Sequence, residues 1–343
     1  KTTTSAMISC IAAQSDVDPT VIIGGEVSIL GGNARNGQGR FIIAEADESD
    51  GSFLKLNSYI AVVTNIEDDH LDYYGTEENI YKAFKQFLGN LVEGGKAILC
   101  VDNAKVKALA QEIDKEVITY GLEEADYVAK DICYGVDGTT YKLYHKDEFV
   151  TEVRLIVPGR HNVLNSVGAF VAAREMGIAD ETILKSLEQF GGAKRRFETK
   201  GKVNGVWVVD DYAHHPTEIE VTLKAARQTQ PKRLLCLFQP HRYTRTQLLF
   251  KEFCNCFNDC DEVILTDIYA ASENPIPGIT SEALAEGISK ATGKAVTYIA
   301  KLPKAEEYLE AKATAGDLIL TVGAGDVFKV GEELVKELER KNK

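Results

Sequence analysis

The α/β fold of this chain is decided by stretches such as Phe41-Ile42-Ile43-Ala44-Glu45-Ala46-Asp47-Glu48-Ser49-Asp50, in which an apolar run passes directly into a cluster of acids. Short apolar runs bounded by turn residues are typical of buried strands, and segments with helical periodicity alternate with them along the chain. This alternation predicts α/β layers around a mainly parallel sheet. Ligands of such sheets bind beyond the carboxyl ends of the strands, so the acids after Ala44 lie where a site is expected.

The first half of the chain is predicted to hold one such sheet with an appendage. Strands are predicted at residues 21–23, 41–44, 60–63 and 97–101, and helices at residues 77–91, 162–176 and 180–190. Residues 127–157 alternate in short strands around a turn at 136–138, which predicts a small antiparallel appendage.

A glycine-rich and basic stretch, Gly191-Gly192-Ala193-Lys194-Arg195-Arg196, is the predicted boundary between domains at residues 1–192 and 193–343. Strand and helix patterns then restart. Strands are predicted at residues 206–209, 234–237, 263–265 and 318–320, and helices are predicted to begin at Pro216, Thr246 and Ser281. This second half resembles a small doubly wound domain.

Composition excludes several classes of partner. The formal net charge is −13 and there is no long basic run, so duplex nucleic acid and anionic membrane surfaces, which both need a cationic face, are not expected partners. No apolar stretch reaches the roughly 18 residues of a membrane span. The 7 cysteines are scattered and odd in number, which favours reduced thiols and a cytoplasmic location.

The segment Lys1-Thr2-Thr3-Thr4 matches the second half of a phosphate-binding loop. A lysine followed by a hydroxyl residue at a helix start lets the ammonium reach the β- and γ-phosphates and the hydroxyl ligate Mg²⁺. On its own, such a pair more often simply begins a helix. Three further segments, described below, support the phosphate-binding interpretation, so we expect an ATP-using enzyme whose loop glycines lie upstream of Lys1, in a longer parent chain.

Acids follow two neighbouring predicted strands. Glu45 follows the first, and on its own this segment is more typical of a solvated acidic loop. The second, Glu67-Asp68-Asp69-His70-Leu71-Asp72, crowds three acids and an imidazole before Leu71, which is unfavourable unless a cation is shared. A carboxylate after the first strand can hold Mg²⁺, and the crowding in the second segment, where the imidazole of His70 lies among oxygen ligands, favours metal binding there.

Two asparagines and a basic run, which follow later in the chain, are further candidates for nucleotide contacts. Asn162 and Asn165 lie three apart on one helical face, where paired amides can contact a nucleotide base, although a helix cap with a surface residue is equally compatible. The run Lys194-Arg195-Arg196-Phe197 at the predicted boundary can be an ordinary solvated basic turn. An arginine at an interdomain hinge can instead stabilise a transferring γ-phosphate.

Two stretches follow strands of the second domain and are expected on one rim of its sheet. They are Asp210-Asp211-Tyr212-Ala213-His214-His215-Pro216 and Gln239-Pro240-His241-Arg242-Tyr243-Thr244-Arg245. Their histidines and forked guanidinium groups suit phosphates or carboxylates.

Taken in order, these motifs resemble the Mur ligase family over nearly the whole chain. The resemblance is carried by the runs Glu45–Asp50, Asp68–Asp72, Gly159–Asn162, Arg195–Phe197, Asp210–Pro216 and Gln239–Arg245. It implies that this chain holds a central ATPase domain of the P-loop type, followed by a Rossmann-like ligase domain. A UDP-binding domain upstream of both is implied as well. It also implies ATP and Mg²⁺ as cofactors and an acyl-phosphate route to an amide bond.

Residue roles come from the same resemblance. Lys1 would hold the β- and γ-phosphates, Thr2, Glu45 and His70 the magnesium ions, Asn162 and Asn165 the base region, and Asp211 the ribose. Arg196 would meet the γ-phosphate, which makes Lys1, His70 and Arg196 the expected catalytic residues. His214, Arg242 and Arg245 would line the substrate side.

The implied substrates are UDP-N-acetylmuramate and L-alanine, since the two-histidine form of Asp210–Pro216 favours the alanine-adding members. A sister ligase that reattaches recycled peptide, a folate polyglutamate synthase, and a nucleotide-binding fragment without turnover are the alternatives. We expect no ligase activity from these 343 residues alone. Lys85, carried on a predicted helix, is expected to be a solvated lysine rather than a CO₂-modified one.

Overall fold

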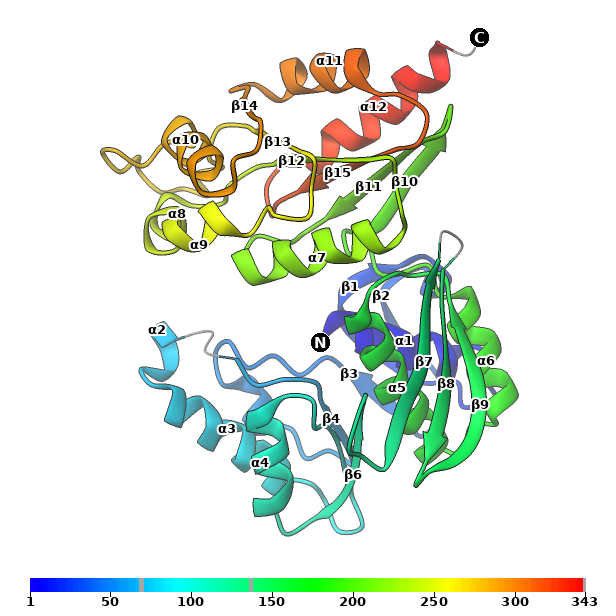
Figure 1. Ribbon diagram of the computed structural model, residues 1–343. Coiled ribbons are helices and arrows are strands. Elements are labelled where there is room, and N and C mark those ends of the chain that lie inside the picture. Colours follow the sequence, from blue (N-terminus) through cyan, green and yellow to red (C-terminus); the bar gives the residue numbers. More distant parts are fainter. Residues whose placement is uncertain (68–70, 136–137, 342–343) are drawn as a thin grey trace. The chain divides into compact units, whose positions relative to one another are not determined.

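The computed structural model describes residues 1–67, 71–135 and 138–341, and the chain divides into two compact units, residues 1–193 and 194–343. Each unit is an α/β layer structure (Figure 1). The predicted fold class, α/β with mainly parallel sheets and a small antiparallel appendage, is confirmed.

The first unit contains two sheets. Its strands are β1 (Thr20–Val27), β2 (Gly32–Arg35), β3 (Ile42–Ala44), β4 (Ile60–Val63), β5 (Lys96–Cys100), β6 (Glu116–Gly121), β7 (Tyr127–Gly135), β8 (Gly138–His145) and β9 (Glu148–Leu155). One sheet has the order β2-β1-β3, and the other has the order β4-β5-β6-β7-β8-β9. Strands β4 to β7 are parallel, whereas β7, β8 and β9 form the antiparallel appendage. Residues 136–137 of the predicted turn lie outside the described residues.

The helices of this unit are α1 (Thr2–Ala13), α2 (Leu71–Tyr74), α3 (Glu77–Gly89), α4 (Ala104–Glu112), α5 (Arg160–Glu175) and α6 (Asp180–Gln189), with short 3-10 turns η1 (Ser28–Leu30) and η2 (Ser52–Lys55). Helices pack on both faces of the larger sheet. Within β5, Ile98 packs in the core that contains α1 and α5, whereas Ala97 and Leu99 pack in the core that contains α3 and α4. This alternation follows from the two-residue period of a strand and explains the continuous apolar run at residues 97–101.

The second unit is doubly wound. Its strands are β10 (Glu198–Val203), β11 (Val206–Asp211), β12 (Arg233–Phe238), β13 (Glu262–Leu265), β14 (Val296–Tyr298) and β15 (Asp317–Val322), in the order β10-β11-β15-β12-β13-β14. Only the β10–β11 pair of this sheet is antiparallel. Its helices are α7 (Pro216–Gln228), α8 (Tyr243–Leu248), α9 (Phe250–Asn255), α10 (Ser281–Thr292), α11 (Leu302–Lys312) and α12 (Phe328–Arg340).

Neighbouring residues of one strand again face opposite helix layers. Val209 packs in a core with α7, α9 and α10, and Val208 packs in a core with α11 and α12. Figure 1 shows α7 on one side of this sheet and α11 and α12 on the other.

One predicted helix was wrong in its start and its continuity. The helix expected from Thr246 begins at Tyr243, and α8 ends at Leu248 before α9 begins at Phe250. Arg242 stands before α8 with a φ of 71° and donates its N–H to the Tyr269 carbonyl at 2.8 Å. This bond to a distant segment sets the helix start, which periodicity alone does not show.

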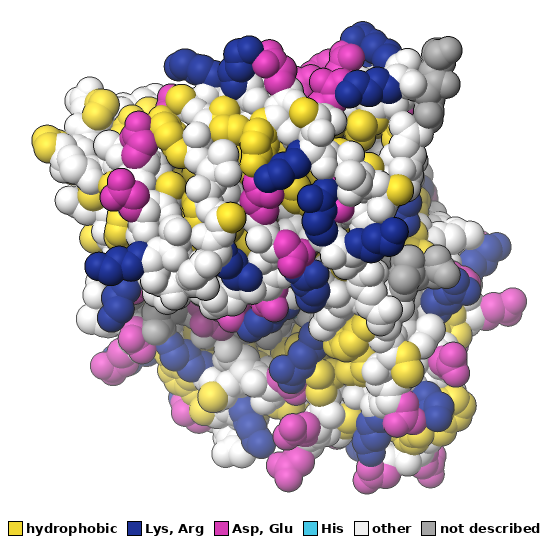
Figure 2. All heavy atoms as spheres, turned by 45° about the horizontal axis from the view of Figure 1, so that its top comes forward, with side chains coloured by type: hydrophobic (Ala, Val, Ile, Leu, Met, Phe, Trp, Pro, Cys, Tyr) yellow, Lys and Arg dark blue, Asp and Glu magenta, His cyan; other side chains and the backbone are white. Residues whose placement is uncertain are grey.

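Within the described part of the chain, no helix has the length and apolarity needed to cross a membrane. On the face shown in Figure 2, Lys and Arg side chains are interspersed with Asp and Glu side chains.

Candidate functional site

The start of α1 and the end of β3 place three predicted site residues together. Thr2 donates its hydroxyl hydrogen to Glu45 Oε1 at 2.7 Å. Glu45 follows β3 directly, and its N–H donates to the Ile22 carbonyl at 2.9 Å, which continues the sheet. A hydroxyl and a carboxylate oxygen at this spacing are the ligand types that Mg²⁺ takes, so these residues fit a magnesium ion.

Lys1 lies beside them and is held by acids. Its Nζ donates to Asp47 Oδ1 at 2.8 Å and also to Glu48. Partial burial acts to lower the pKa of Lys1, but its hydrogen bonds to Asp47 and Glu48 outweigh that effect and raise the pKa. The ammonium is therefore charged at neutral pH and available to an anion that competes with these acids.

A glycine pair after Ile23 makes this arrangement possible, and sequence reasoning missed it. Gly24 donates its N–H to Glu45 Oε2 at 2.7 Å. A Cβ on Gly25 would lie 2.6 Å from Thr2 Cγ2, closer than side chains pack. The signal for this close approach was the break that Gly24-Gly25 makes in an otherwise apolar run.

Asn162 and Asn165 are brought together on α5 and tied to α1. Asn162 is buried, and its Nδ2 donates to the Pro158 carbonyl at 2.7 Å while its Oδ1 accepts from Asn165 Nδ2 at 3.3 Å. Asn165 Oδ1 accepts from Thr4 Oγ1 at 3.0 Å. The amides therefore link the helix that begins with Thr2 to the helix expected to contact a nucleotide base.

His70 lies outside the described residues, so its predicted metal and catalytic roles stay predictions. Glu67, from the same acidic segment, accepts a hydrogen bond from Asn103 Nδ2 at 3.3 Å. Within residues 1–67, 71–135 and 138–341, no group of three or more His, Cys, Asp and Glu side chains is arranged to hold a metal. Among the predicted metal ligands, Thr2 and Glu45 are the two that the described residues bring together.

Lys85 pairs with Glu112 at 2.7 Å on the surface of the first unit, with both side chains more than two-fifths exposed. This is the arrangement of an ordinary surface ion pair.

In the second unit, Asp211 is the last residue of β11, and both of its carboxylate oxygens accept hydrogen bonds from backbone N–H groups. Oδ1 accepts from the Ala213 N–H and Oδ2 from the Phe197 N–H, each at 2.8 Å. Burial raises the pKa of Asp211 to about 6, against the opposing effects of the Arg196 charge and the two backbone donors. Contact with a ribose, expected for this residue, stays a prediction.

This raised pKa predicts an unusual pH dependence of stability. Because the pKa of Asp211 is higher in the folded chain than in the unfolded chain, its contribution is fully present below about pH 4 and is lost as pH rises through about 6. Relative to an Asp211→Asn variant, the wild-type free energy of unfolding is expected to fall by roughly 2–3 kcal/mol from about pH 4 to pH 7. Urea unfolding can be followed through Trp207, the single tryptophan of the chain.

Asp261 is the matched control for this measurement. Hydrogen bonds from the Leu234 N–H and Arg227, acting against burial, lower its pKa. An Asp261→Asn comparison is therefore expected to show the opposite trend, with wild-type stability lost as pH falls. Parallel pH curves for wild type and Asp211→Asn would contradict the assignment.

His214 is held in one tautomer. Its Nδ1 lies 3.0 Å from the Tyr212 carbonyl, which can only accept, so Nδ1 carries the hydrogen and Nε2 is the acceptor. Glu218 on α7 accepts the backbone N–H groups of His214 and His215 at 3.0 and 3.2 Å. Burial lowers the pKa of His214, so the ring is neutral at neutral pH.

His241 and Arg245 form a second group, and sequence reasoning assigned no role to the histidine. Arg245 Nη1 lies 3.1 Å from His241 Nδ1, and the His241 ring stacks on Tyr269 with centroids 5.5 Å apart. Burial, followed by the Arg245 charge, lowers the pKa of His241 to about 4. The rings of His214 and His241 lie 6.1 Å apart, so the two groups are neighbours.

Cationic side chains surround these neutral rings. The charges of Arg245 and Arg196 both act on His214, and those of Arg245 and Arg242 act on His241. Arg196 Cζ lies 5.7 Å from the centroid of the Tyr212 ring. The three arginines bring guanidinium groups, which suit an anionic ligand, to the two histidines, whereas Glu218 and Glu273 bring opposing negative charge.

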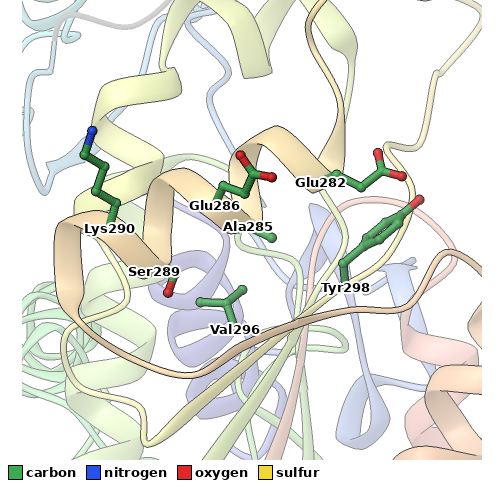
Figure 3. A pocket seen from close by; sticks show the side chains of 7 residues that line it. All are labelled: Glu282, Ala285, Glu286, Ser289, Lys290, Val296 and Tyr298. Atoms are coloured by element: carbon green, nitrogen blue, oxygen red, sulfur yellow. The ribbon is translucent and has the colours of Figure 1, made fainter.

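A surface pocket of about 570 Å³ lies elsewhere in the second unit, between α10 and β14. Figure 3 shows its lining, which includes the carboxyl groups of Glu282 and Glu286 and the hydroxyl of Tyr298. Its lining includes none of the predicted site residues that the structure describes.

Comparison with known proteins matches two families in succession. Residues 1–173 match the Mur ligase middle domain, and residues 195–325 match the Mur ligase glutamate ligase domain.

Individual relatives match the chain throughout. It is 50% identical to the UDP-N-acetylmuramate–L-alanine ligase of Desulforamulus reducens, over 99% of this chain and 74% of that protein. It is 46% identical to the ligase of the same name from Pelotomaculum thermopropionicum, over 100% of this chain and 75% of that protein.

Solved structures agree. The UDP-N-acetylmuramate–alanine ligase of Thermotoga maritima superposes with a TM-score of 0.85 at 26% identity, covering 99% of this chain and 74% of that one. The MurF ligase of Thermotoga maritima, solved in complex with ADP, shares the fold with a TM-score of 0.77 at 21% identity. The match covers 99% of this chain and 78% of that one.

Proposed function

This chain belongs to the Mur ligase family, and on that premise we propose that the whole protein joins L-alanine to UDP-N-acetylmuramate at the expense of ATP. In this proposal, residues 1–192 form the ATP-binding domain and residues 193–343 form the ligase domain. ATP supplies the γ-phosphoryl group that converts the muramate carboxylate into an acyl phosphate.

The observation that carries the proposal is the group at the start of α1. Thr2 and Glu45 present two oxygen ligands 2.7 Å apart, and the charged Nζ of Lys1 lies on the neighbouring residue. A helix start with a lysine and a hydroxyl is suited to bind phosphate and Mg²⁺ together. Thr2 and Glu45 would hold the metal, and Lys1 would exchange its carboxylate partners for phosphate oxygens.

Arg196 supplies the second requirement of phosphoryl transfer. Its guanidinium would neutralise charge on the transferring group, which matters because such reactions are accelerated mainly by positioning and electrostatics. The guanidinium groups of Arg196, Arg242 and Arg245 suit the carboxylates of UDP-N-acetylmuramate and L-alanine.

We propose that His214 acts on the amine of the amino acid. An amino acid must lose a proton from its ammonium group before the nitrogen attacks an acyl phosphate, and this proton needs an acceptor. The neutral ring keeps Nε2 unprotonated because Nδ1–H is bonded to the Tyr212 carbonyl. We assign His214 Nε2 as the atom that receives or relays this proton.

The test uses the full-length protein with UDP-N-acetylmuramate, Mg²⁺ and ATP. The acyl acceptors to be compared are L-alanine, L-serine, glycine and a peptidoglycan-derived tripeptide. ADP release is followed continuously, and the product is identified by mass spectrometry. We expect the highest kcat/KM with L-alanine, and complete loss with EDTA that added Mg²⁺ reverses. A preference for the tripeptide would instead identify a peptide-recycling ligase.

A further inference from the structure

Arg196 lies between two residues with unusual backbone conformations. The φ angles of Arg195 and Phe197 are 59° and 51°, in the left-handed region that non-glycine residues rarely adopt. Such conformations persist only where surrounding contacts enforce them, and they gather at functional sites. The contacts that enforce them here are made by Arg195 and by Asp211.

The Arg195 side chain is 20% exposed and is held by several contacts in the second unit. Its Nε donates to Asp210 Oδ2 at 3.0 Å, and Asp210 is fully buried. Its Nη2 donates to the Gly323 carbonyl. Its Cζ lies 4.8 Å from the Tyr212 ring centroid and 4.6 Å from that of Phe328, so the guanidinium is held between two aromatic side chains.

The backbone around Arg196 is tied to the same strand on both sides. The Arg195 carbonyl accepts the Tyr212 N–H at 2.7 Å, and the Phe197 N–H donates to Asp211 at 2.8 Å. Asp210, Asp211 and Tyr212 are consecutive at the end of β11. Arg196 is therefore carried by the second unit as a fixed part of it and not by a loose connecting segment.

We propose that Arg195 is a positioning residue that fixes the guanidinium of Arg196 for phosphoryl transfer. This inference rests on the proposed function, because it assigns Arg196 to the transferring phosphate. The guanidinium of Arg195 is occupied by Asp210, Gly323 and the two rings, so in this proposal it acts through Arg196 and not on the substrate itself. Its effect is on orientation, where small displacements strongly reduce rate.

The test compares variants of the full-length protein. Arg195→Met removes the contacts of the guanidinium, and we expect kcat to fall roughly 10- to 100-fold with KM for ATP and for L-alanine changed less than about threefold. Arg195→Lys keeps the charge beside Asp210 but loses the planar stacking, and an intermediate kcat is expected. Thermal melting confirms that each variant is folded at the assay temperature.

Arg233→Met is the matched control. Arg233 also pairs with a buried aspartate of the second unit, since Asp317 is 1% exposed and bonded at 2.6 Å. Its loss is expected to destabilise the unit in a comparable way, but Arg233 lies at the start of β12, away from Arg196. A merely structural role for Arg195 predicts equal kcat values for Arg195→Met and Arg233→Met, and that outcome would overturn the proposal.

The double variant Arg195→Met/Arg196→Met separates the possible failures. If Arg195 acts through Arg196, kcat of the double variant equals that of Arg196→Met alone, whereas independent losses that multiply contradict the inference. An Arg196→Met variant with wild-type kcat would overturn the role of Arg196 and the inference with it. Absence of alanine ligation by the wild type would overturn the proposed function itself.

Discussion

Replacing Arg196 by methionine in the full-length protein is expected to lower kcat by roughly 10³-fold while KM for ATP changes by less than about threefold. The guanidinium is proposed to stabilise charge on the transferring phosphoryl group, so its loss affects the transition state more than the bound ground state. Steady-state measurement of ADP release at saturating alanine and UDP-N-acetylmuramate gives both constants.

Arg227→Met is the control for this variant. Arg227 lies on α7 of the same unit and pairs with Asp261 at 2.9 Å, outside the group around His214. Its removal is expected to leave kcat within about twofold of wild type, as for other partly exposed ion pairs. The assignment of Arg196 fails if both variants retain wild-type turnover.

Replacing Lys1 by methionine is expected to lower kcat/KM for ATP by roughly 10²- to 10³-fold. The variant loses the ammonium and also leaves Asp47 and Glu48, both bonded to Lys1, without their cation near the incoming phosphates. Like charges then repel the triphosphate, so ATP affinity is expected to fall together with the rate. Calorimetric titration with Mg-ATP measures the affinity, and coupled ADP release measures the rate.

Lys85→Met is the lysine control for Lys1→Met. Lys85 makes an exposed pair with Glu112, so its loss is expected to have little effect on activity. If Lys85→Met instead loses most of its activity, and wild-type activity depends on bicarbonate, Lys85 is CO₂-modified. Lys1→Met with unchanged ATP affinity would contradict the assignment of Lys1.

Much of the fold was predictable because buried strands leave a strong local signal. The apolar runs at residues 60–63, 206–209 and 318–320 became β4, β11 and β15, since each of these strands contributes to the cores beside it. The division of one predicted helix into α8 and α9 was not predictable. Their break at Leu249 and the start set by the bond from Arg242 to Tyr269 depend on contacts between segments distant in sequence.

The candidate site shows the same division. Sequence by itself determined which chemical groups follow the strands, because acids after β3 and a histidine pair after β11 are visible in the order of residues. Only the tertiary structure decided the partners of these groups. It placed the Thr2 hydroxyl on Glu45, occupied both oxygens of Asp211 with backbone donors, and joined Arg195 to Gly323, 128 residues away. The physical reason is that periodicity records which face of an element is buried, whereas hydrogen bonds between distant residues exist only after the layers have packed.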